Sequence, residues 1–225
     1  MRSYDVAVVG GGPAGATAAR DLAAAGFDTV LLDKAGRIKP CGGAVPPRLL
    51  EEFDIPESLL SAKVRGARMI SPAAREVHMP IGGWVGMVDR EDFDEFLRHR
   101  AAWAGTERRQ GCFEHLERVG KLATLTYRGP EGDRQRIGAR MVIGADGALS
   151  RVRRQCVPQA GSTGFVFAYH EIVTAPSHGQ ANFNPACCDV VYDAATSPDF
   201  YAWVFPHGAT ASIGTGSAAK GFPLR

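Results

Sequence analysis

A glycine-rich turn near the N-terminus constrains the fold more than any other feature of this sequence. Residues 4–9 form a Val-rich run typical of a buried strand, and Gly10, Gly12 and Gly15 follow in the spacing Gly-x-Gly-x-x-Gly. Residues 14–25 are rich in alanine and predict a helix. The order of strand, glycine turn and helix predicts the first part of a Rossmann βαβ unit.

Each glycine has its own predicted role. Gly10 allows the tight turn out of the strand, Gly12 leaves the backbone open to a pyrophosphate, and Gly15 lets the helix pack closely on the strand. The helix predicted to begin at Ala14 presents its free N–H groups and the positive end of its dipole to phosphates. The turn therefore predicts a dinucleotide site.

An acidic residue ends the next predicted strand. Gly26 stands where the helix should end, residues 29–32 read as a strand, and Asp33 lies 18 residues after Gly15. That spacing suits the acid that hydrogen-bonds the ribose hydroxyls of an adenosine, and an acid disfavours a 2′-phosphate. NADP is therefore not expected at this turn. The alternative is a glycine-rich turn in another kind of βαβ unit.

Composition excludes several classes of protein. The chain has 225 residues, enough for one large or two small domains, and a net charge of +2, which implies no strong attraction to nucleic acid. No apolar run approaches the roughly 20 residues that span a bilayer. The five cysteines include no Cys-x-x-Cys pair, which favours a reducing compartment over a disulfide framework or a zinc site. With no signal peptide before the first strand, we expect a cytoplasmic protein without a metal.

Two further positions are candidate ligand contacts. Cys41-Gly42-Gly43 leaves the backbone bare, as when a flat ligand lies against it. The alternative is a surface loop with a free thiol. Arg90 opens a helix expected over residues 90–104, where its charge opposes the helix dipole, which suggests another role. A solvated arginine is the alternative.

The rest of the chain reads mostly as strands. Short strands are expected at residues 64–70, 76–79 and 84–88, separated by prolines and glycines, and residues 108–137 predict a meander in an accessory sheet. Residues 140–143 predict a third parallel strand. The Gly-Ala-Asp-Gly sequence that follows, with Asp146 and Gly147, resembles the second nucleotide motif of flavoprotein hydroxylases. The alternative is an ordinary strand-to-helix turn.

An aromatic row stands near the C-terminus. Tyr201, Trp203 and Phe205 alternate, so all three should face one side of a strand. Such a row is usually part of a sheet core, and it can also form the wall of an apolar cavity.

Taken together, these motifs resemble the geranylgeranyl reductase family of chlorophyll and bacteriochlorophyll synthesis. The glycine-rich turn and Gly-Ala-Asp-Gly are shared across a flavoprotein superfamily, whereas Cys-Gly-Gly and Pro-x-x-Tyr-x-Trp-x-Phe-Pro, starting at Pro198, are more specific. The resemblance covers essentially the whole chain.

The resemblance implies an α/β fold, with a Rossmann-like FAD-binding domain of the flavin hydroxylase type and an inserted, mostly antiparallel β substrate domain. The FAD-binding domain is expected over residues 1–160, with strands from 64–88 reaching the substrate sheet. Residues 161–225 would begin the substrate domain. Family members continue with another Gly-Asp motif and a helical part, so the chain is expected to be a fragment.

The implied activity is reduction of geranylgeranyl double bonds to phytyl, on the free diphosphate or on the pigment, with FAD and NADPH, or a ferredoxin in some relatives. Cys41 or Tyr201 would supply a proton or form the cavity wall, and Tyr201, Trp203 and Phe205 would line the substrate tunnel. The lipid substrate is compatible with peripheral contact with photosynthetic membranes. The implied FAD contacts are Gly10, Gly12, Pro13, Ala14, Gly15, Asp33, Lys34, Cys41, Gly42, Gly43, Arg90, Asp146 and Gly147. The alternatives are a flavin-dependent monooxygenase and an inactive nucleotide-binding fragment.

Overall fold

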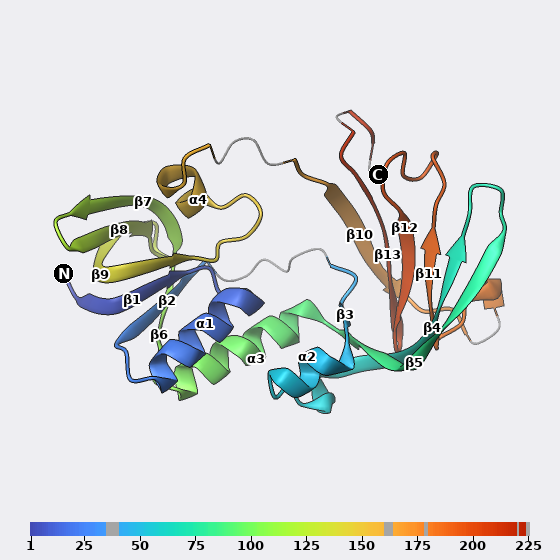
Figure 1. The fold of residues 1–225 in the computed structure, drawn as a ribbon, viewed down its shortest axis with the longest axis horizontal. Helices are drawn as coiled ribbons and strands as arrows, with labels where there is room; N and C mark the ends of the chain where they lie inside the picture. The colour runs from blue at the N-terminus through green and yellow to red at the C-terminus, as the bar shows by residue number, and fades with distance from the viewer. Residues whose placement is uncertain (35–40, 160–163, 178–179, 220, 224–225) are drawn as a thin grey trace. The chain divides into compact units, whose positions relative to one another are not determined.

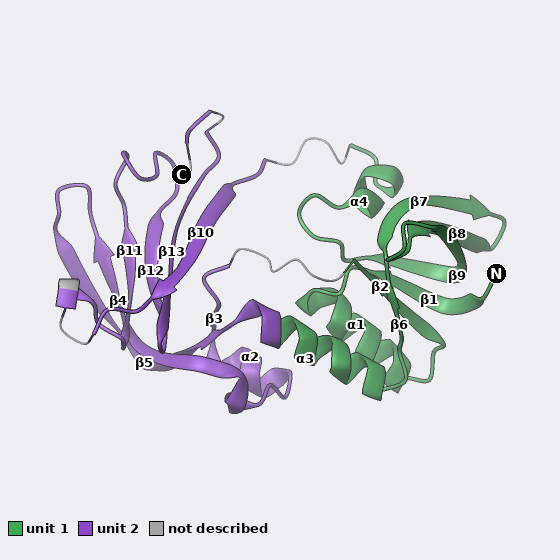
Figure 2. Ribbon diagram, turned by 180° about the vertical axis from the view of Figure 1, so that it is seen from behind, with its two compact units in different colours: residues 1–37, 93–163 green, residues 38–92, 164–225 purple. Residues whose placement is uncertain are grey.

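The computed structural model describes residues 1–34, 41–159, 164–177, 180–219 and 221–223. The chain divides into two compact units, coloured separately in Figure 2. Unit 1 comprises Met1–Arg37 and Phe93–Thr163, and unit 2 comprises Ile38–Asp92 and Gly164–Arg225. Each unit is therefore built from two separate segments of the sequence.

Unit 1 begins with the predicted βαβ arrangement. β1 (Ser3–Val9), α1 (Pro13–Ala24) and β2 (Thr29–Asp33) lie within one or two residues of the predicted bounds. β1 and β2 pair in parallel, and Gly26, just beyond the helix, has φ +88°, a conformation that favours glycine. The local signals in the sequence are sufficient to define these elements.

The described part of unit 1 contains a six-stranded sheet in the order β6-β2-β1-β9-β8-β7. The later strands are β6 (Glu107–Gln110), β7 (Cys112–Val119), β8 (Leu122–Arg128) and β9 (Arg134–Gly144). The first half of β9 pairs antiparallel with β8, and its second half pairs in parallel with β1. The prediction of a separate accessory sheet was wrong, because β9 continues through both pairings without a break.

The meander nevertheless covers the parallel strands. Its side chains share one hydrophobic core with those of β1 and β2, and Figure 1 shows α1 and α3 (Arg90–Trp103) together on the other side of these strands. Burial on both faces explains why β1 reads as a continuous apolar run. The larger side chains of this core are Tyr4, Val9, Val30, Leu32, Phe113, Leu125, Tyr127, Ile137 and Val152.

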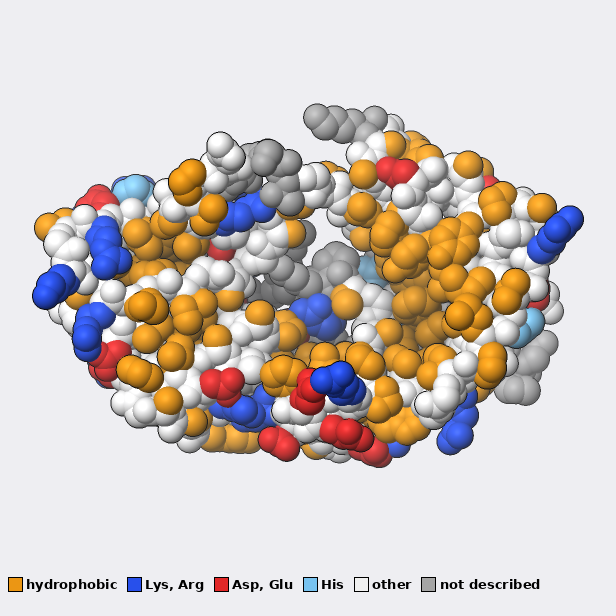
Figure 3. Space-filling view, in the orientation of Figure 1, with side chains coloured by type: hydrophobic (Ala, Val, Ile, Leu, Met, Phe, Trp, Pro, Cys, Tyr) orange, Lys and Arg blue, Asp and Glu red, His pale blue; other side chains and the backbone are white. Residues whose placement is uncertain are grey.

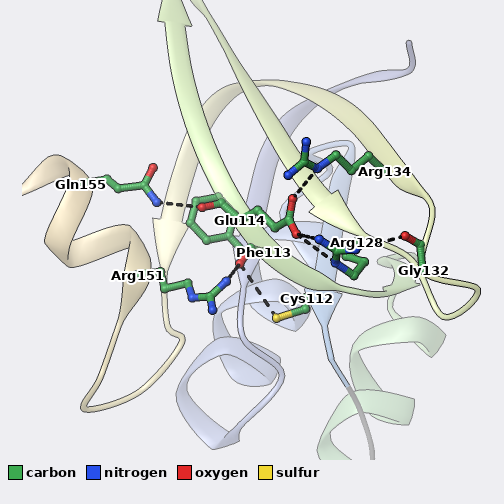
Figure 4. Close-up of polar contacts among 8 residues, drawn as sticks. All are labelled: Cys112, Phe113, Glu114, Arg128, Gly132, Arg134, Arg151 and Gln155. Carbon is green, nitrogen blue, oxygen red and sulfur yellow. Dashed lines mark hydrogen bonds and ion pairs between the residues drawn. The ribbon is translucent and has the colours of Figure 1, made fainter.

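A short helix, α4 (Arg151–Cys156), is held on the edge strand β7 by side chains (Figure 4). The Gln155 side chain accepts from the backbone N–H of Leu116 and donates to the carbonyl of Glu114, both at 3.0 Å. Arg151 Nη1 donates to the carbonyl of Phe113 at 3.0 Å. These bonds satisfy edge groups of the sheet and fix the loop that leads from β9 into α4.

The described part of unit 2 contains a seven-stranded sheet in the order β10-β13-β12-β11-β4-β5-β3. All of its neighbouring strands are antiparallel except the pair β4 and β11, in agreement with the predicted mostly antiparallel sheet. A short helix, α2 (Pro47–Glu52), contacts β5. The strands are β3 (Ala44–Val45), β4 (Leu60–Ile70), β5 (Glu76–Val88), β10 (Phe167–Thr174), β11 (Cys187–Val191), β12 (Ala202–His207) and β13 (Thr210–Ser217).

The units differ from the predicted domain ranges in the placement of residues 38–92. β4 and β5 lie in the same sheet as β10–β13, because residues 66–70 of β4 pair with β11. This pairing places the whole 38–92 segment in unit 2 rather than in a continuous domain over 1–160. The assignment of FAD and substrate roles to the two parts stays a prediction.

The prediction of separate strands within residues 76–88 was wrong. β5 is one strand, and a register shift in its pairing with β4 accommodates the residues between Pro80 and Val85. Gly83 in this stretch has φ +108°. The proline and glycines therefore form an irregularity inside a strand rather than a turn between strands.

Among the described residues, the helices are all too short or too polar to cross a membrane.

Candidate functional site

The glycine-rich turn of unit 1 is closely packed at its first and last glycines. Gly10 has φ +105°, and a Cβ there would meet the carbonyl of Ala145 and lie 2.8 Å from the Cα of Asp146. A Cβ on Gly15 would overlap the carbonyl oxygen of Gly10. Contacts within the chain therefore require both glycines, as the predicted tight turn and close helix packing demand.

Gly12 is different, because no contact among the described residues requires a glycine there. No described heavy atom lies within 4 Å of a Cβ at this position, and its φ of −73° and ψ of 179° suit any residue. Gly12 directly precedes Pro13, the first residue of α1. The open space thus lies at the N-terminus of a 12-residue helix, where a bound pyrophosphate is expected, so the turn fits a dinucleotide.

Asp33, at the end of β2, lies against this turn. Its Oδ2 accepts from the backbone N–H of Gly11 at 2.7 Å. Lys34, the next residue, is exposed. Arg98 of α3, which sequence reasoning missed, donates from Nη1 to the carbonyl of Gly11 at 3.1 Å. Asp33 and Arg98 therefore fix both backbone groups of Gly11.

Arg98 is itself held by an ion pair. Its Nε lies 2.7 Å from Glu95 Oε2, and Arg108 Nη1 lies 2.9 Å from Glu95 Oε1. Partial burial opposes ionisation of Glu95, but hydrogen bonds from Arg108 and Arg98 outweigh it and lower the pKa of the carboxyl. The carboxylate therefore remains charged at neutral pH and orients the guanidinium that contacts Gly11.

The second predicted nucleotide motif lies beside the first. The N–H of Ala145 donates to the carbonyl of Val9 at 2.8 Å, and Gly147 has φ +86°. The Asp146 carboxylate accepts from the Ser150 hydroxyl and from the backbone N–H of Arg151 at 2.6 Å. Asp146 thus acts within the chain as a cap of α4, as the strand-to-helix alternative predicts. Its contact with a nucleotide stays a prediction.

Cys41, Gly42 and Gly43 lie in unit 2. A Cβ on Gly42 would lie 2.6 Å from Phe205 Cδ2, and one on Gly43, which has φ +74°, would lie 2.7 Å from His207 Cε1. The two glycines are therefore explained by packing against the chain's own side chains, without a flat ligand. Cys41 is exposed, and its Sγ accepts from the N–H of Gly43 at 3.4 Å.

His207, at the end of β12, is a second residue that sequence reasoning missed. Its side chain is buried, with Nε2 3.0 Å from the carbonyl oxygen of Gly42 and Nδ1 3.0 Å from Asp89 Oδ1. The Ser61 hydroxyl lies 3.2 Å from the same Nδ1. Arg90, the first residue of α3, follows Asp89 and is partly buried. No motif marks His207 in the sequence, because its partners come from distant segments.

The aromatic row follows the predicted alternation. Ring centroids of Tyr201 and Trp203, and of Trp203 and Phe205, are 6.2 Å apart in each case. Trp203 is only 6% exposed, because it lies over Gly214 and donates from Nε1 to Ser212 Oγ at 3.1 Å. Tyr201 and Phe205 are half-buried. Trp203 thus packs within the sheet, and the neighbouring rings present more surface.

The same face of the sheet carries further apolar side chains. Trp203 lies opposite Val190, Val190 opposite Met69, and Met69 opposite Val77, so these residues share a face. Val77 is 58% exposed. Figure 3 shows hydrophobic side chains gathered over the strands of unit 2. This apolar surface suits a flexible hydrocarbon better than a polar substrate.

Within the described ranges, no cluster of three or more His, Cys, Asp or Glu side chains could hold a metal ion. The βαβ unit and the glycine-rich turn, with the antiparallel sheet, define the chain as a dinucleotide-binding α/β protein of the flavoprotein type. It belongs to the pyridine nucleotide-disulphide oxidoreductase family, whose profile matches residues 4–182.

Two relatives of this chain are both named geranylgeranyl diphosphate reductase. The geranylgeranyl diphosphate reductase of Rhodobacter capsulatus is 57% identical over 99% of the chain, and that of Synechocystis is 39% identical over 94%. These matches confirm the resemblance that the motifs indicated. The chain spans 56% and 54% of the lengths of these two relatives.

Solved structures agree with the fold. A geranylgeranyl bacteriochlorophyll reductase-like protein from Thermoplasma acidophilum matches 97% of this chain and 57% of its own, with a TM-score of 0.84 and 27% identity. The myxobacterial chondrochloren halogenase matches 96% of this chain and 53% of its own, with a TM-score of 0.75 and 19% identity. The second match concerns the fold alone. The Rossmann-like fold of a flavin enzyme, and with it a flavin cofactor, is therefore supported.

Proposed function

We propose that this chain is the FAD-binding part, and the beginning of the substrate-binding part, of a geranylgeranyl reductase. The observation that carries the proposal is the 57% identity to the Rhodobacter capsulatus geranylgeranyl diphosphate reductase over 99% of the chain. The open position at Gly12 supports it, because a dinucleotide explains a glycine that packing does not require. The reductase names of the relatives favour reduction over oxygen-dependent hydroxylation.

The residues proposed to hold FAD in unit 1 surround the glycine-rich turn. The N-terminus of α1 would receive the pyrophosphate, and Asp33 the ribose hydroxyls. Bound FAD would supply hydride transfer to an isolated alkene, with NADPH as the proposed electron donor. The remaining proposed FAD contacts are Lys34, Cys41, Gly42, Gly43, Arg90, Asp146 and Gly147.

In unit 2, the chain's own residues would bind the substrate and hold a proton. The half-buried rings of Tyr201 and Phe205 are proposed to contact the hydrocarbon, with Trp203 supporting them from within the sheet. Cys41 Sγ and the Tyr201 hydroxyl are the proposed proton donors, which deliver a proton to one alkene carbon. The substrates proposed are geranylgeranyl diphosphate and a pigment carrying the same group, the latter met at a membrane surface.

The first test is flavin binding by the 225-residue chain. Apo-protein is titrated with FAD, and quenching of flavin fluorescence is followed for the natural chain and for Gly12→Val. We expect saturable, one-to-one binding that the substitution abolishes. Equal FAD binding by the natural chain and by Gly12→Val would contradict the proposal that FAD binds at the glycine-rich turn.

The second test measures activity in a full-length protein. Residues 1–225 replace the matching 224 residues of the Rhodobacter capsulatus relative, and the chimaera is incubated without oxygen with FAD, NADPH and geranylgeranyl diphosphate. Mass spectrometry should show products heavier by two hydrogens per reduced double bond. A chimaera that binds FAD yet yields no such product, beside an active parent, would contradict the proposal. A parallel incubation with oxygen tests for the hydroxylated product of a monooxygenase.

A further inference from the structure

His207 makes contacts in unit 2 that tie three distant segments together. Its ring lies between the carbonyl of Gly42, the carboxylate of Asp89, which directly precedes α3, and the hydroxyl of Ser61 on β4. The ring is buried, with an exposed fraction of 5%. A buried polar side chain with all of its partners inside the same unit is suited to hold those segments in a fixed arrangement.

Every partner of the ring is a hydrogen-bond acceptor. The carbonyl of Gly42 can only accept, and a carboxylate such as Asp89 accepts when ionised. Ser61 donates its own proton to the carbonyl of Met87 at 3.0 Å, so it presents a lone pair to His207. The contact with the Gly42 carbonyl therefore requires an N–H on the ring nitrogen that faces it, Nε2.

A second histidine of unit 2 interacts electrostatically with His207. His170 on β10 has a lowered pKa, first because it is partly buried and second because of the nearby charge of His207. Asp89 supplies the opposite charge, 3.0 Å from Nδ1 of the ring. The titratable neighbours of His207 thus include one carboxylate and one histidine.

The contact with Gly42 reaches Cys41 through the backbone. Gly43 adopts φ +74°, and its carbonyl accepts from the N–H of Val88 at 2.9 Å. Its own N–H then points to Cys41 Sγ at 3.4 Å. The Gly42 carbonyl, which contacts His207, and the Gly43 N–H, which donates to Cys41 Sγ, belong to the same peptide group. Rotation of this peptide would therefore break both hydrogen bonds at once.

We propose that His207 is a positioning residue for Cys41, because its Nε2 holds the Gly42–Gly43 peptide that donates a hydrogen bond to the thiol sulfur. The role rests on the proposed function, in which Cys41 faces the reaction. The hydrogen bond directs the sulfur and stabilises the negative charge on it when it attacks an electrophile. Cys41 is already exposed, so loss of the hydrogen bond lowers its reactivity rather than uncovering it.

The test measures alkylation of each cysteine in the 225-residue chain, without flavin or substrate. Iodoacetamide is applied at a series of pH values, and peptide mass spectrometry gives a rate for each thiol. In His207→Leu, alkylation of Cys41 at pH 7.5 should slow by roughly 2- to 10-fold, the loss expected for one hydrogen bond.

Cys188 reports on unfolding in the same experiment. It is buried, and burial raises the pKa of its thiol to about 12, so it should stay unreactive while unit 2 is folded. Simultaneous reaction of Cys41 and Cys188 in His207→Leu would mean general loosening of unit 2 and would overturn the positioning role. An unchanged Cys41 rate in a folded variant would also overturn it.

Two further variants sharpen the result. His207→Gln keeps an N–H donor near Nε2 and should restore the Cys41 rate to within about twofold of the natural chain. A Gln variant as slow as the Leu variant would reject the hydrogen bond as the cause. His170→Leu, which removes another partly buried histidine of unit 2, should leave the Cys41 rate unchanged. Because no step requires reductase activity, failure of this proposal is distinct from failure of the proposed function.

Discussion

The open space at Gly12 gives the sharpest test of the cofactor assignment. Gly12→Ala adds one methyl group that meets no described heavy atom within 4 Å, and the φ of −73° suits alanine. As an N-cap residue, alanine is less favourable than glycine, but it also restricts the unfolded chain. The two effects oppose each other, so we expect the free energy of unfolding of the apo-protein to change by less than about 1 kcal/mol. For a chain of this size that is a shift of at most about 4 °C in Tm.

Flavin binding should respond very differently. If a pyrophosphate approaches the Cα of Gly12, the added methyl group must displace it, and overpacking of this kind costs about 1–3 kcal/mol. We therefore expect FAD affinity to fall about 5- to 150-fold in Gly12→Ala, measured by titration with flavin fluorescence.

Gly15→Ala is the matched control. Its Cβ would overlap the carbonyl oxygen of Gly10, so the apo-protein itself should lose about 1–3 kcal/mol or more and melt at a lower temperature. Unchanged FAD affinity in Gly12→Ala would refute the assignment of this space to the cofactor. A fall in apo-protein Tm equal to that of Gly15→Ala would refute the statement that the space is open.

Three other predictions follow from the packing and charge of the two units. Trp203→Ala should destabilise the chain by about 3–5 kcal/mol in urea unfolding, because the ring is almost fully buried, and a smaller loss would favour a ligand-facing role. Folding lowers the pKa of Glu95. The ion pairs of Glu95 with Arg98 and Arg108 should therefore stabilise the native state fully at pH values above the pKa of the carboxyl in the unfolded chain. This stabilisation should be lost as the pH falls through the lower pKa of the carboxyl in the folded chain. Glu95→Gln should flatten that part of the pH–stability curve, and an unchanged curve would contradict the assignment. Gln155→Ala should lower the free energy of unfolding by about 1–2 kcal/mol, measured by thermal unfolding, because two hydrogen bonds to β7 are lost. Gln155→Glu should keep the hydrogen bond from the Leu116 N–H, so its loss of stability should be about half as large.

The elements that the sequence predicted well are those that depend on local signals. The strand, glycine turn and helix around Gly12 lie close to their predicted bounds, because residue type and spacing determine them. Tyr201, Trp203 and Phe205 also lie on one face of the sheet as predicted, and each ring contacts the next. This could be predicted because the direction of a side chain in a strand alternates with its position.

The features that were missed depend on pairing between distant segments. β9 joins the meander to the parallel strands because it meets β8 on one side and β1 on the other, and no local pattern indicates two partners. Arg98 and His207 act by holding backbone carbonyls of Gly11 and Gly42. Many side chains with an N–H or O–H group can donate to a carbonyl, so neither residue belongs to a recognisable motif.

The pairing of β4 with β11 has a consequence for biosynthesis. β4 ends at Ile70, and its parallel neighbour begins only at Cys187. At a synthesis rate of about 5–20 residues per second, roughly 6–24 s pass before the ribosome has made β11. During that interval unit 1 gains all of its own segments, whereas the β4–β5 hairpin waits with an unpaired edge. In the emerging chain, unit 1 can therefore complete its sheet before β4 of unit 2 has its parallel partner.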